Sequence, residues 1–498
     1  ASLWLLLQST TLLFPGQKLN PESQCSTCIP SHREASMKKT VVLYPGFAAS
    51  HFVPMLQLAD ALLEEGYAVV VALIDLTMDH DAALAAAVAR VASAAKPSVT
   101  IHRLPRIENP PAMTNDSRML LGYFETVRRY NEPFRDFLSS LRRRGSVHAV
   151  IMDGPSAEAL DVTRELGVPA YLFYATNASA VAAFVQLAQI RKEGDPSFRE
   201  LGDAPLDIRG VPPMPASHLM AEFLEDPESE VYQEMTNVKR RDTKPDGILV
   251  NTFPSLEPRA LAALRDPRLL LPGWRTPPPP VYCVGPLVVA PGERKEKHEC
   301  LAWLDAQPER SVVFLCFGII GLVSHTAEQL GEIAVGLERS GHRFLWVVRA
   351  PNVEGPERAF DPNADRDLDA LLPDGFLERT SGRGLVVKLW APQVEVLHHR
   401  ATGAFVTHCG WNSAMEAITA GVPMVCWPLY AEQKMNKVFM VEEARIGVEV
   451  DGWQKGMVKA EEHRDTAAIA WKHGGSSRAA FAQFLSDAGN LRLEQTLA

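Results

Sequence analysis

The chain has 498 residues, of which 46% are hydrophobic and 22% charged, so it is long enough for two or three domains of ordinary globular composition. Its net charge of −10 at pH 7 argues against a nucleic-acid-binding protein and against a polybasic membrane-surface protein. No stretch reaches the ~20 consecutive apolar residues that a membrane-spanning helix requires. We therefore expect a globular monomer with no nucleic-acid partner and no integral membrane segment.

The seven cysteines indicate a reducing compartment, because their number is odd and several fall in predicted buried strands. Cys25 and Cys28 have the spacing of a metal or redox pair, but no second pair or histidine cluster accompanies them, and we interpret the spacing as coincidence. Residues 1–36 begin with an apolar run that lacks the basic leading region of a secretory signal. We interpret them as a disordered leader or a gene-model extension, with a secretory signal as the alternative, and expect a cytoplasmic protein.

The first structured elements begin near Met37. Thr40 to Tyr44 is a short apolar strand, and residues His51 to Glu65 have the apolar spacing of a helix that stops at Gly66. A second apolar strand, Tyr67 to Ile74, follows. This alternation predicts a doubly wound α/β sheet.

Two polar residues follow strands of this predicted sheet. His51 lies where the first strand meets the first helix, whose positive end keeps an imidazole neutral and able to accept a proton. From position alone, a catalytic base and a histidine that caps the turn are nearly equal alternatives. Asp153 follows the strand His148 to Met152, so its carboxylate is expected at the same sheet edge, the alternative being a cap for a helix that begins near Ser156.

The remainder of the first half continues the pattern up to a polar linker. We expect a loop and helix over residues 105–135, and then strands and a helix in the order 167–174, Ala178 to Arg191 and Gly247 to Phe253, the last being the final strand of this half. Proline-rich and then charged residues follow. We therefore expect an N-terminal domain over 37–285 and a linker over 286–297.

The second half of the chain, residues 298–475, shows the same alternation of predicted strands and helices, and we expect it to form a second domain. The expected elements are the strand Ser311 to Phe317, the helix Thr326 to Ser340, and the strands Phe344 to Val348 and Leu385 to Leu389. Two Rossmann-like sheets that face a ligand crevice follow from this pattern.

The segment from Trp390 to Gln433 contains one more strand–helix–strand unit. A strand at Ala404 to Thr407 leads through the turn His408 to Ser413 into a helix that runs from Ser413 to Ala420. The amino end of a helix offers unpaired N–H groups and a partial positive charge, which suit a diphosphate. Gly410 lets the backbone approach such a ligand, and His408 adds a hydrogen-bond donor.

This segment resembles the signature of the plant family 1 UDP-glycosyltransferases, which have the GT-B fold. Nine of its residues fall in register with that signature: Trp390, Gln393, His408, Trp411, Asn412, Ser413, Glu416, Glu432 and Gln433. The resemblance extends, more weakly, from about Met37 to the C-terminus. It implies two Rossmann-like domains and an inverting transfer of glucose from UDP-glucose to a hydroxyl of a small phenolic, flavonoid-like acceptor, without a cofactor or a metal.

The resemblance also implies a role for each matched residue. Uracil stacks on Trp390, with Ala391 and Gln393 near the nucleoside; Glu416 holds the ribose instead of completing a capping box with Ser413. His408, Asn412 and Ser413 surround the diphosphate, while Glu432 and Gln433 hold sugar hydroxyls, and Gln433 with Trp411 favours glucose. In the first half, the sequence His51-Phe-Val-Pro54 selects His51 as the base, with Asp153 as its partner.

Two departures from the family pattern motivate an alternative. Ile319 and Ile320 occupy a turn where the family has a small hydroxyl residue beside the donor phosphates, and the region after Glu462 is shorter than usual before the expected C-terminal helix over 476–498. The alternative is therefore a catalytically impaired UDP-sugar-binding relative. A nicotinamide dehydrogenase is disfavoured because no Gly-x-Gly-x-x-Gly follows a strand. Loops near 105–135, 174–195 and 210–235 are expected to form the acceptor pocket.

Overall fold

The computed structural model describes residues 39–458 except 47, 76–84, 86–87, 90–98, 113–117, 146, 267–277, 290–291, 293–297, 319–324 and 350–367. These residues belong to one compact unit. Several predictions lie outside the described residues: the leader 1–36 with Cys25 and Cys28, the turn at Ile319 and Ile320, and the C-terminal helix over 476–498.

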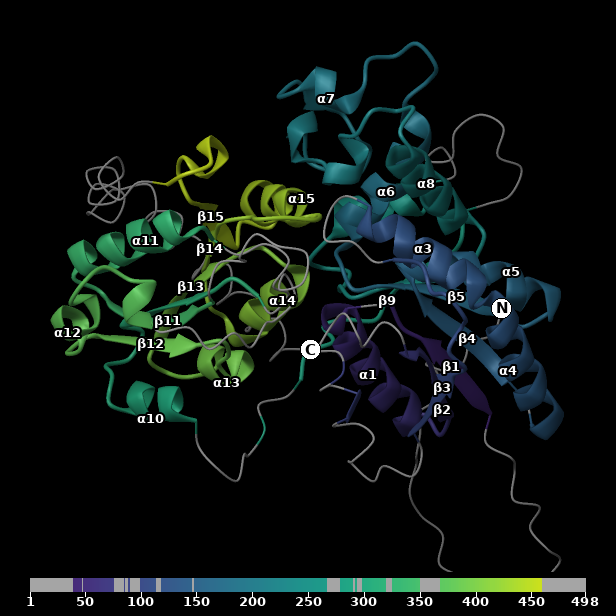
Figure 1. Ribbon diagram of the computed structural model, residues 1–498, viewed down its shortest axis with the longest axis horizontal. Coiled ribbons are helices and arrows are strands. Elements are labelled where there is room, and N and C mark those ends of the chain that lie inside the picture. Colours follow the sequence, from purple (N-terminus) through teal and green to yellow (C-terminus); the bar gives the residue numbers. More distant parts are fainter. Residues whose placement is uncertain are drawn as a thin grey trace, which may run out of the picture. The chain divides into compact units, whose positions relative to one another are not determined.

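The first sheet contains seven strands, all paired in parallel (Figure 1). In spatial order they are β3 (Val99–Leu104), β2 (Ala68–Ile74), β1 (Thr40–Tyr44), β4 (Val147–Asp153), β5 (Ala170–Tyr174), β8 (Gly247–Val250) and β9 (Val281–Cys283). The order reverses between β1 and β4. In open α/β sheets, ligands bind outside the carboxyl ends of the strands at such a reversal.

The second sheet contains six parallel strands with the same reversal, here between β10 and β13. Its spatial order is β12 (Gly384–Lys388), β11 (Arg343–Val348), β10 (Val312–Cys316), β13 (Thr402–Thr407), β14 (Met424–Cys426) and β15 (Gly447–Glu449). The prediction of two doubly wound Rossmann-like sheets is therefore confirmed.

Side chains alternate between the two faces of a strand, and both sets are apolar in β1. Helices therefore cover both faces of the first sheet. Val41 and Leu43 pack against Phe52 of α1, whereas Val42 and Tyr44 belong to the cluster on the opposite face. The helices of this half are α1 (Ala49–Glu64), α3 (Met119–Arg129), α4 (Asn131–Arg144), α5 (Leu160–Glu165), α6 (Ala178–Ile190), α7 (Phe198–Leu201), α8 (Glu230–Arg240) and α9 (Pro258–Leu264).

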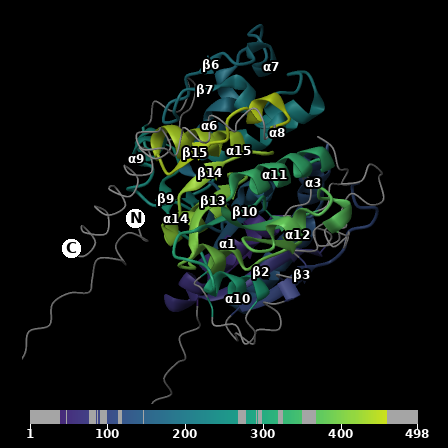
Figure 2. The ribbon, with the colours of Figure 1, turned by 90° about the vertical axis from the view of Figure 1, so that its left-hand side faces the viewer.

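The second sheet is covered in the same way. Leu315 and Trp346 pack on one face with Leu330 of α11, while Phe314 and Leu345 pack on the other with residues of α10, α13 and α14. Figure 2 shows α11 above the strands of this sheet and α10 below them. The helices are α10 (Glu299–Asp305), α11 (Ala327–Ser340), α12 (Phe376–Thr380), α13 (Gln393–Leu397), α14 (Trp411–Ala420) and α15 (Gln433–Val438).

Shorter elements join these layers. They are the antiparallel pair β6 (Pro205–Leu206) and β7 (Met214–Pro215), the 3₁₀ turns η2 (Gly154–Ala159), η3 (Ala216–His218), η4 (Ala221–Phe223), η5 (Arg241–Thr243), η7 (Leu368–Ala370) and η9 (Trp453–Lys455), and the π turn η8 (Phe439–Glu443).

The structure corrects the first half in two places. The strand at Gly247 is not the last, because Val281–Cys283 forms β9 and pairs with β8. Three residues between prolines carry too little periodicity to be recognised as a strand. The edge strand β3 was also missed, since its exposed His102 and Arg103 interrupt the apolar run that identifies a buried strand.

Two helices begin earlier than expected. Helix α1 begins at Ala49 and not at His51, and α14 begins at Trp411 and not at Ser413. Gly410 is the N-cap residue of α14, so Ser413 lies inside the helix and forms no capping box with Glu416. Gly421 ends this helix in the left-handed conformation, directly after the expected last residue Ala420.

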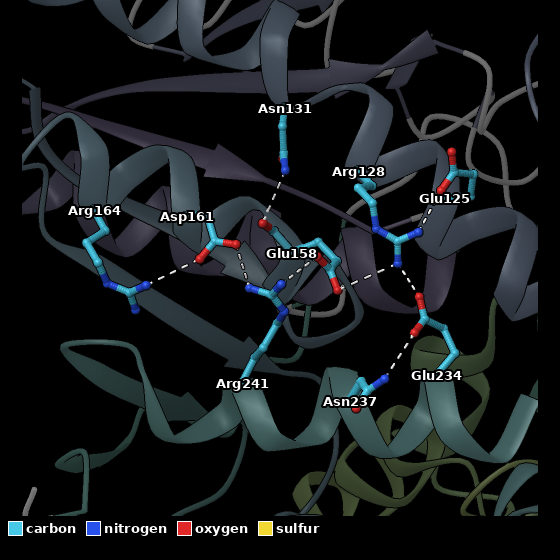
Figure 3. A network of polar contacts seen from close by, with 9 residues as sticks. All are labelled: Glu125, Arg128, Asn131, Glu158, Asp161, Arg164, Glu234, Asn237 and Arg241. Atoms are coloured by element: carbon cyan, nitrogen blue, oxygen red, sulfur yellow. Dashed lines mark hydrogen bonds and ion pairs between the residues drawn. The ribbon is translucent and has the colours of Figure 1, made fainter. Parts of the chain in front are cut away.

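A network of charged side chains anchors the segment that follows β4 (Figure 3). Glu158 of η2 is nearly buried, and its carboxylate lies 2.9 Å from Arg241 and 3.9 Å from Arg128. Arg128 also pairs with Glu234 of α8, and Arg241 with Asp161 of α5. The network ties α3, α5, α8 and η5 to η2, which begins directly after Asp153.

Candidate active site

His51 and Asp153 are brought together by the first sheet. His51 lies in the first turn of α1, and Asp153 is the last residue of β4, the strand next to β1. His51 Nδ1 lies 2.9 Å from each carboxylate oxygen of Asp153. The Asp153 side chain is 1% exposed, whereas that of His51 is 36% exposed. Asp153 forms no side-chain cap to η2, so the capping alternative is wrong.

The backbone around this pair leaves little room. A Cβ atom at Gly46 would overlap Asp153 Oδ2, and one at Gly154 would lie 2.5 Å from the Tyr174 ring. Glycine is therefore required on both sides of the carboxylate. Close by, the buried hydroxyls of Tyr123 and Ser156 lie 2.6 Å apart.

The environment raises the pKa of His51. Burial acts to lower this pKa, but the charge of Asp153 and its hydrogen bond to the ring outweigh burial, and the charge of Glu432 adds to the increase. Lys239 of α8 acts in the opposite direction. Glu432 directly precedes α15, so a charge from the second half of the chain also contributes to the pKa of His51.

His408 is a second histidine with a different environment. It directly follows β13 and is buried, and burial lowers its pKa to about 4. Its Nδ1 has no hydrogen-bond partner among the described residues. A Cβ at Gly318 would lie 2.7 Å from His408 Nε2, and a Cβ at Gly410 would overlap that atom as well. The ring is thus a neutral imidazole held between two glycine backbones.

The start of α14 contacts the first half of the chain through two side chains. Trp411 is 2% exposed, and its Nε1 donates to the carbonyl of Asn251 at 2.7 Å. Asn412 Nδ2 donates to the carbonyl of Ser50, the residue before His51, while Asn412 Oδ1 is buried and has no hydrogen-bond partner within the described part of the chain. The two predicted donor residues therefore also connect α14 to the first half of the chain, Trp411 to the residue after β8 and Asn412 to α1.

The expected nucleoside residues form one cluster. Gln393 Nε2 donates to Ser413 Oγ at 2.9 Å and to Glu416 Oε2 at 2.7 Å. Burial raises the pKa of Glu416 to about 7, and the hydrogen bond from Gln393 opposes that increase. Trp390 is 40% exposed beside buried Ala391, which leaves part of the indole on the surface.

Glu432 and Gln433, the last two residues of the predicted signature, have different hydrogen-bond partners. Glu432 Oε1 lies 3.3 Å from Asn436 Nδ2 and 3.5 Å from Thr176 Oγ1. Gln433 is buried, and its Oε1 accepts from the backbone N–H groups of Leu429 and Tyr430. Gln433 therefore shapes the loop that presents Glu432.

Sequence reasoning missed three residues of this site. Thr176, Asn177 and Asn436 are buried and connect β5 and α6 to Glu432. The signal available for Asn436 was its spacing, since it lies one helical turn after Glu432 and residues at i and i+4 share a helix face.

Among the described residues, no three side chains of His, Cys, Asp or Glu gather as a metal site would require. Of the helices in these ranges, none is long and apolar enough to cross a membrane.

Comparison with known sequences finds relatives that are all named as glycosyltransferases or glucosyltransferases. A sequence profile of the family described as "UDP-glucoronosyl and UDP-glucosyl transferase" matches residues 279–457. UDP-glycosyltransferase 88B1 of Stevia rebaudiana is 39% identical over 86% of this chain and 89% of its own length. Anthocyanidin 5,3-O-glucosyltransferase of a Rosa hybrid cultivar is 40% identical over 85% and 88%, and phloretin 2'-O-glucosyltransferase of Malus domestica 38% over 86% and 90%.

Solved structures agree with this result. A UDP-glucosyltransferase from Polygonum tinctorium that glucosylates indoxyl superposes with a TM-score of 0.75 at 32% identity, covering 91% of this chain and 94% of its own. UGT2 of Phytolacca americana, solved with UDP-2-fluoro-glucose and pterostilbene, superposes with a TM-score of 0.72 at 29% identity and the same coverage. With two Rossmann-like sheets and these relatives, the chain has the GT-B fold and belongs to the family of plant UDP-glycosyltransferases.

Proposed function

We propose that this chain transfers glucose from UDP-glucose to a hydroxyl of a small phenolic, flavonoid-like acceptor, with inversion at the anomeric carbon. The observation that carries the proposal is the pair of His51 and Asp153, whose atoms lie 2.9 Å apart with Glu432 of the other sheet close enough to influence the histidine. The acceptors named for its relatives, anthocyanidin and phloretin, are phenolics and support the acceptor class.

The histidine acts as the general base. A carboxylate accepts hydrogen bonds, so Nδ1 carries the hydrogen that points to Asp153 and Nε2 keeps a lone pair. Nε2 takes the proton of the acceptor hydroxyl while the oxygen attacks the anomeric carbon from the face opposite UDP. The new C–O bond forms as the bond to the diphosphate breaks, and its electron pair leaves with UDP. Asp153 stabilises the imidazolium that results.

The turn before α14 receives the diphosphate. The amino end of this helix supplies N–H groups and a partial positive charge, and neutral His408 adds a hydrogen-bond donor without a charge of its own. Asn412 and Ser413 lie in the first turn of the helix and complete this subsite.

The nucleoside and the sugar occupy the two flanks of that turn. Uracil stacks on the exposed part of Trp390, close to Ala391 and Gln393, and Glu416 accepts hydrogen bonds from the ribose hydroxyls. Glu432 and Gln433 hold the glucose, and the influence of the Glu432 charge on the pKa of His51 supports an anomeric carbon near that histidine. The acceptor enters from loops near 105–135, 174–195 and 210–235.

The redox state of the cysteines bears on the cellular compartment. Cys283, Cys300, Cys316, Cys409 and Cys426 are all free thiols, which supports a reducing compartment, and we propose the cytoplasm.

The test is product formation by the purified chain with UDP-glucose and a panel of flavonoids and simpler phenols, followed by mass spectrometry. We expect a product heavier than its acceptor by one glucosyl group, with the β configuration by NMR because UDP-glucose is an α-glycoside. An α-glucoside would contradict inversion. Binding of UDP-glucose without any product would instead favour the impaired relative suggested by Ile319 and Ile320.

A further inference from the structure

Asn436 of α15 is fully buried and connects three parts of the molecule. Its Oδ1 accepts from Asn177 Nδ2 at 2.8 Å, across 259 residues of sequence. Its Nδ2 donates to the carbonyl of Cys409 at 3.0 Å and lies 3.3 Å from Glu432 Oε1. Each side of this amide therefore has its own partners, and these partners determine which way the amide points.

The partners of Asn436 belong to the proposed donor site on one side. Cys409 is the residue between His408 and Gly410 in the phosphate-binding turn, and it has a positive φ of 65°. Glu432 is the carboxylate assigned to the sugar, and Thr176 Oγ1 approaches the same Oε1 atom at 3.5 Å. Both contacts reach Oε1, so Oε2 is the oxygen that a sugar hydroxyl meets.

On the other side, the network ends in the first half of the chain. Asn177 is 1% exposed, and its Oδ1 accepts from the backbone N–H of Ala180 at 2.6 Å as the N-cap of α6. The cap fixes the Asn177 side chain and therefore the direction in which its Nδ2 donates. Helix α6 thus provides a rigid reference for Asn436.

We propose that Asn436 is a positioning residue of the sugar subsite, which holds the Glu432 carboxylate in register with the phosphate-binding turn at Cys409 and with helix α6 across the interface. A buried amide with three satisfied hydrogen bonds is expensive to replace, because each lost bond leaves a buried partner unsatisfied. This inference rests on the proposed function, since it assigns Glu432 to the sugar.

The test compares the affinities of UDP-glucose and UDP, measured by calorimetry without acceptor. We expect Asn436→Ala to weaken UDP-glucose by about ten-fold through loss of a hydrogen bond to a charged group, and UDP by no more than about two-fold. Equal weakening of both ligands, or no change in either, would overturn the proposal. The exposed Asn237, whose amide contacts Glu234 and Arg240 on α8, gives the control Asn237→Ala with both affinities unchanged.

A double-mutant cycle tests whether Asn436 acts through Glu432. Glu432→Gln should weaken UDP-glucose, and adding Asn436→Ala should cause little further loss, because residues in one network are not additive. Fully additive losses would contradict a role through Glu432.

Asn177→Ser keeps a side-chain oxygen for the cap of α6 but removes the donor to Asn436. We expect a loss of about three-fold that is confined to UDP-glucose, smaller than that of Asn436→Ala because the contact to Glu432 remains. This variant also provides a test if Asn436→Ala does not fold. If Asn177→Ser bound UDP-glucose and UDP with wild-type affinities, the proposed role of the contact between Asn177 and Asn436 would be refuted. These readouts need no turnover, so a protein that binds UDP-glucose but forms no glucoside would refute the proposed function alone.

Discussion

His51 and His408 occupy similar places in the two sheets and behave in opposite ways. Each lies where a central strand of its sheet meets a helix amino end. His51 keeps part of its ring on the surface and contacts a buried carboxylate, and its pKa is raised. His408 is buried and has no carboxylate partner among the residues that the structure describes, and its pKa falls to about 4. The helix end is common to both, so the neighbouring carboxylate decides which histidine accepts a proton.

In the proposed mechanism, this difference assigns two tasks, proton acceptance to His51 and diphosphate binding to His408. A base must change its charge during turnover, and the Asp153 carboxylate stabilises the charged form. A group beside the diphosphate need only donate a hydrogen bond, and a histidine that stays neutral does so at any pH above about 5. The predictions below test this separation.

The largest effect is expected for His51→Ala. Removal of the general base should lower kcat by roughly 10²- to 10⁴-fold, while the affinity for UDP-glucose, measured without acceptor, stays unchanged. The control His342→Ala alters an exposed histidine outside the site and should retain full activity. If His51→Ala lost UDP-glucose binding to the same extent as turnover, the role of base would be wrong.

Asp153→Asn should come next, with kcat/KM reduced by roughly 10²-fold. The free base of His51 is the active form, so activity falls as pH drops below its pKa. Since Asp153 raises that pKa, its neutralisation should move the acid limb of the pH–rate profile to lower pH. An acid limb that stays in place would show that another group controls it.

His408→Ala should act on binding. Loss of a hydrogen bond to a charged ligand should weaken UDP-glucose by roughly ten-fold or more, equally at pH 6 and pH 8, because the pKa of His408 lies below this window. A loss that changed with pH between these values would mean that His408 becomes charged in the complex, and the contrast with His51 would fail.

The smallest effect concerns Glu416, whose pKa is raised to about 7 mainly by burial. Because ribose hydroxyls donate to the ionised carboxylate, UDP-glucose affinity should rise a few-fold between pH 6 and pH 8. Glu416→Gln should remove this dependence. UDP-glucose is the appropriate ligand, since its diphosphate has no ionisation near neutral pH.

The raised pKa of Glu416 also predicts a pH dependence of the unfolding free energy. The folded protein holds the Glu416 proton more tightly than the unfolded chain, whose carboxyl has its ordinary pKa of 4.5. The stabilisation is therefore fully present below pH 4.5 and is lost as the pH rises through about 7. In Glu416→Gln, the unfolding free energy should lose this part of its pH dependence.

The sequence alone predicted those site residues that lie close together along the chain. Residues of the donor site lie within one short segment from Trp390 to Gln433, and glycines and apolar runs identify the strand–helix–strand unit that carries them. The buried strand Thr40–Tyr44 was also predicted to the residue, because buried parallel strands are continuous apolar runs. The edge strand β3 and the three-residue strand β9 lack that signal.

Only the tertiary structure decided the contacts between distant segments. His51 and Asp153 are 102 residues apart, and their side chains meet only because β1 and β4 pair side by side. Asn177 and Asn436 are 259 residues apart, and nothing in either local sequence indicates the other. Hydrophobic periodicity reports which face of an element is buried, but a hydrogen bond between buried polar groups depends on which elements meet, and that is settled by the packing of the whole fold.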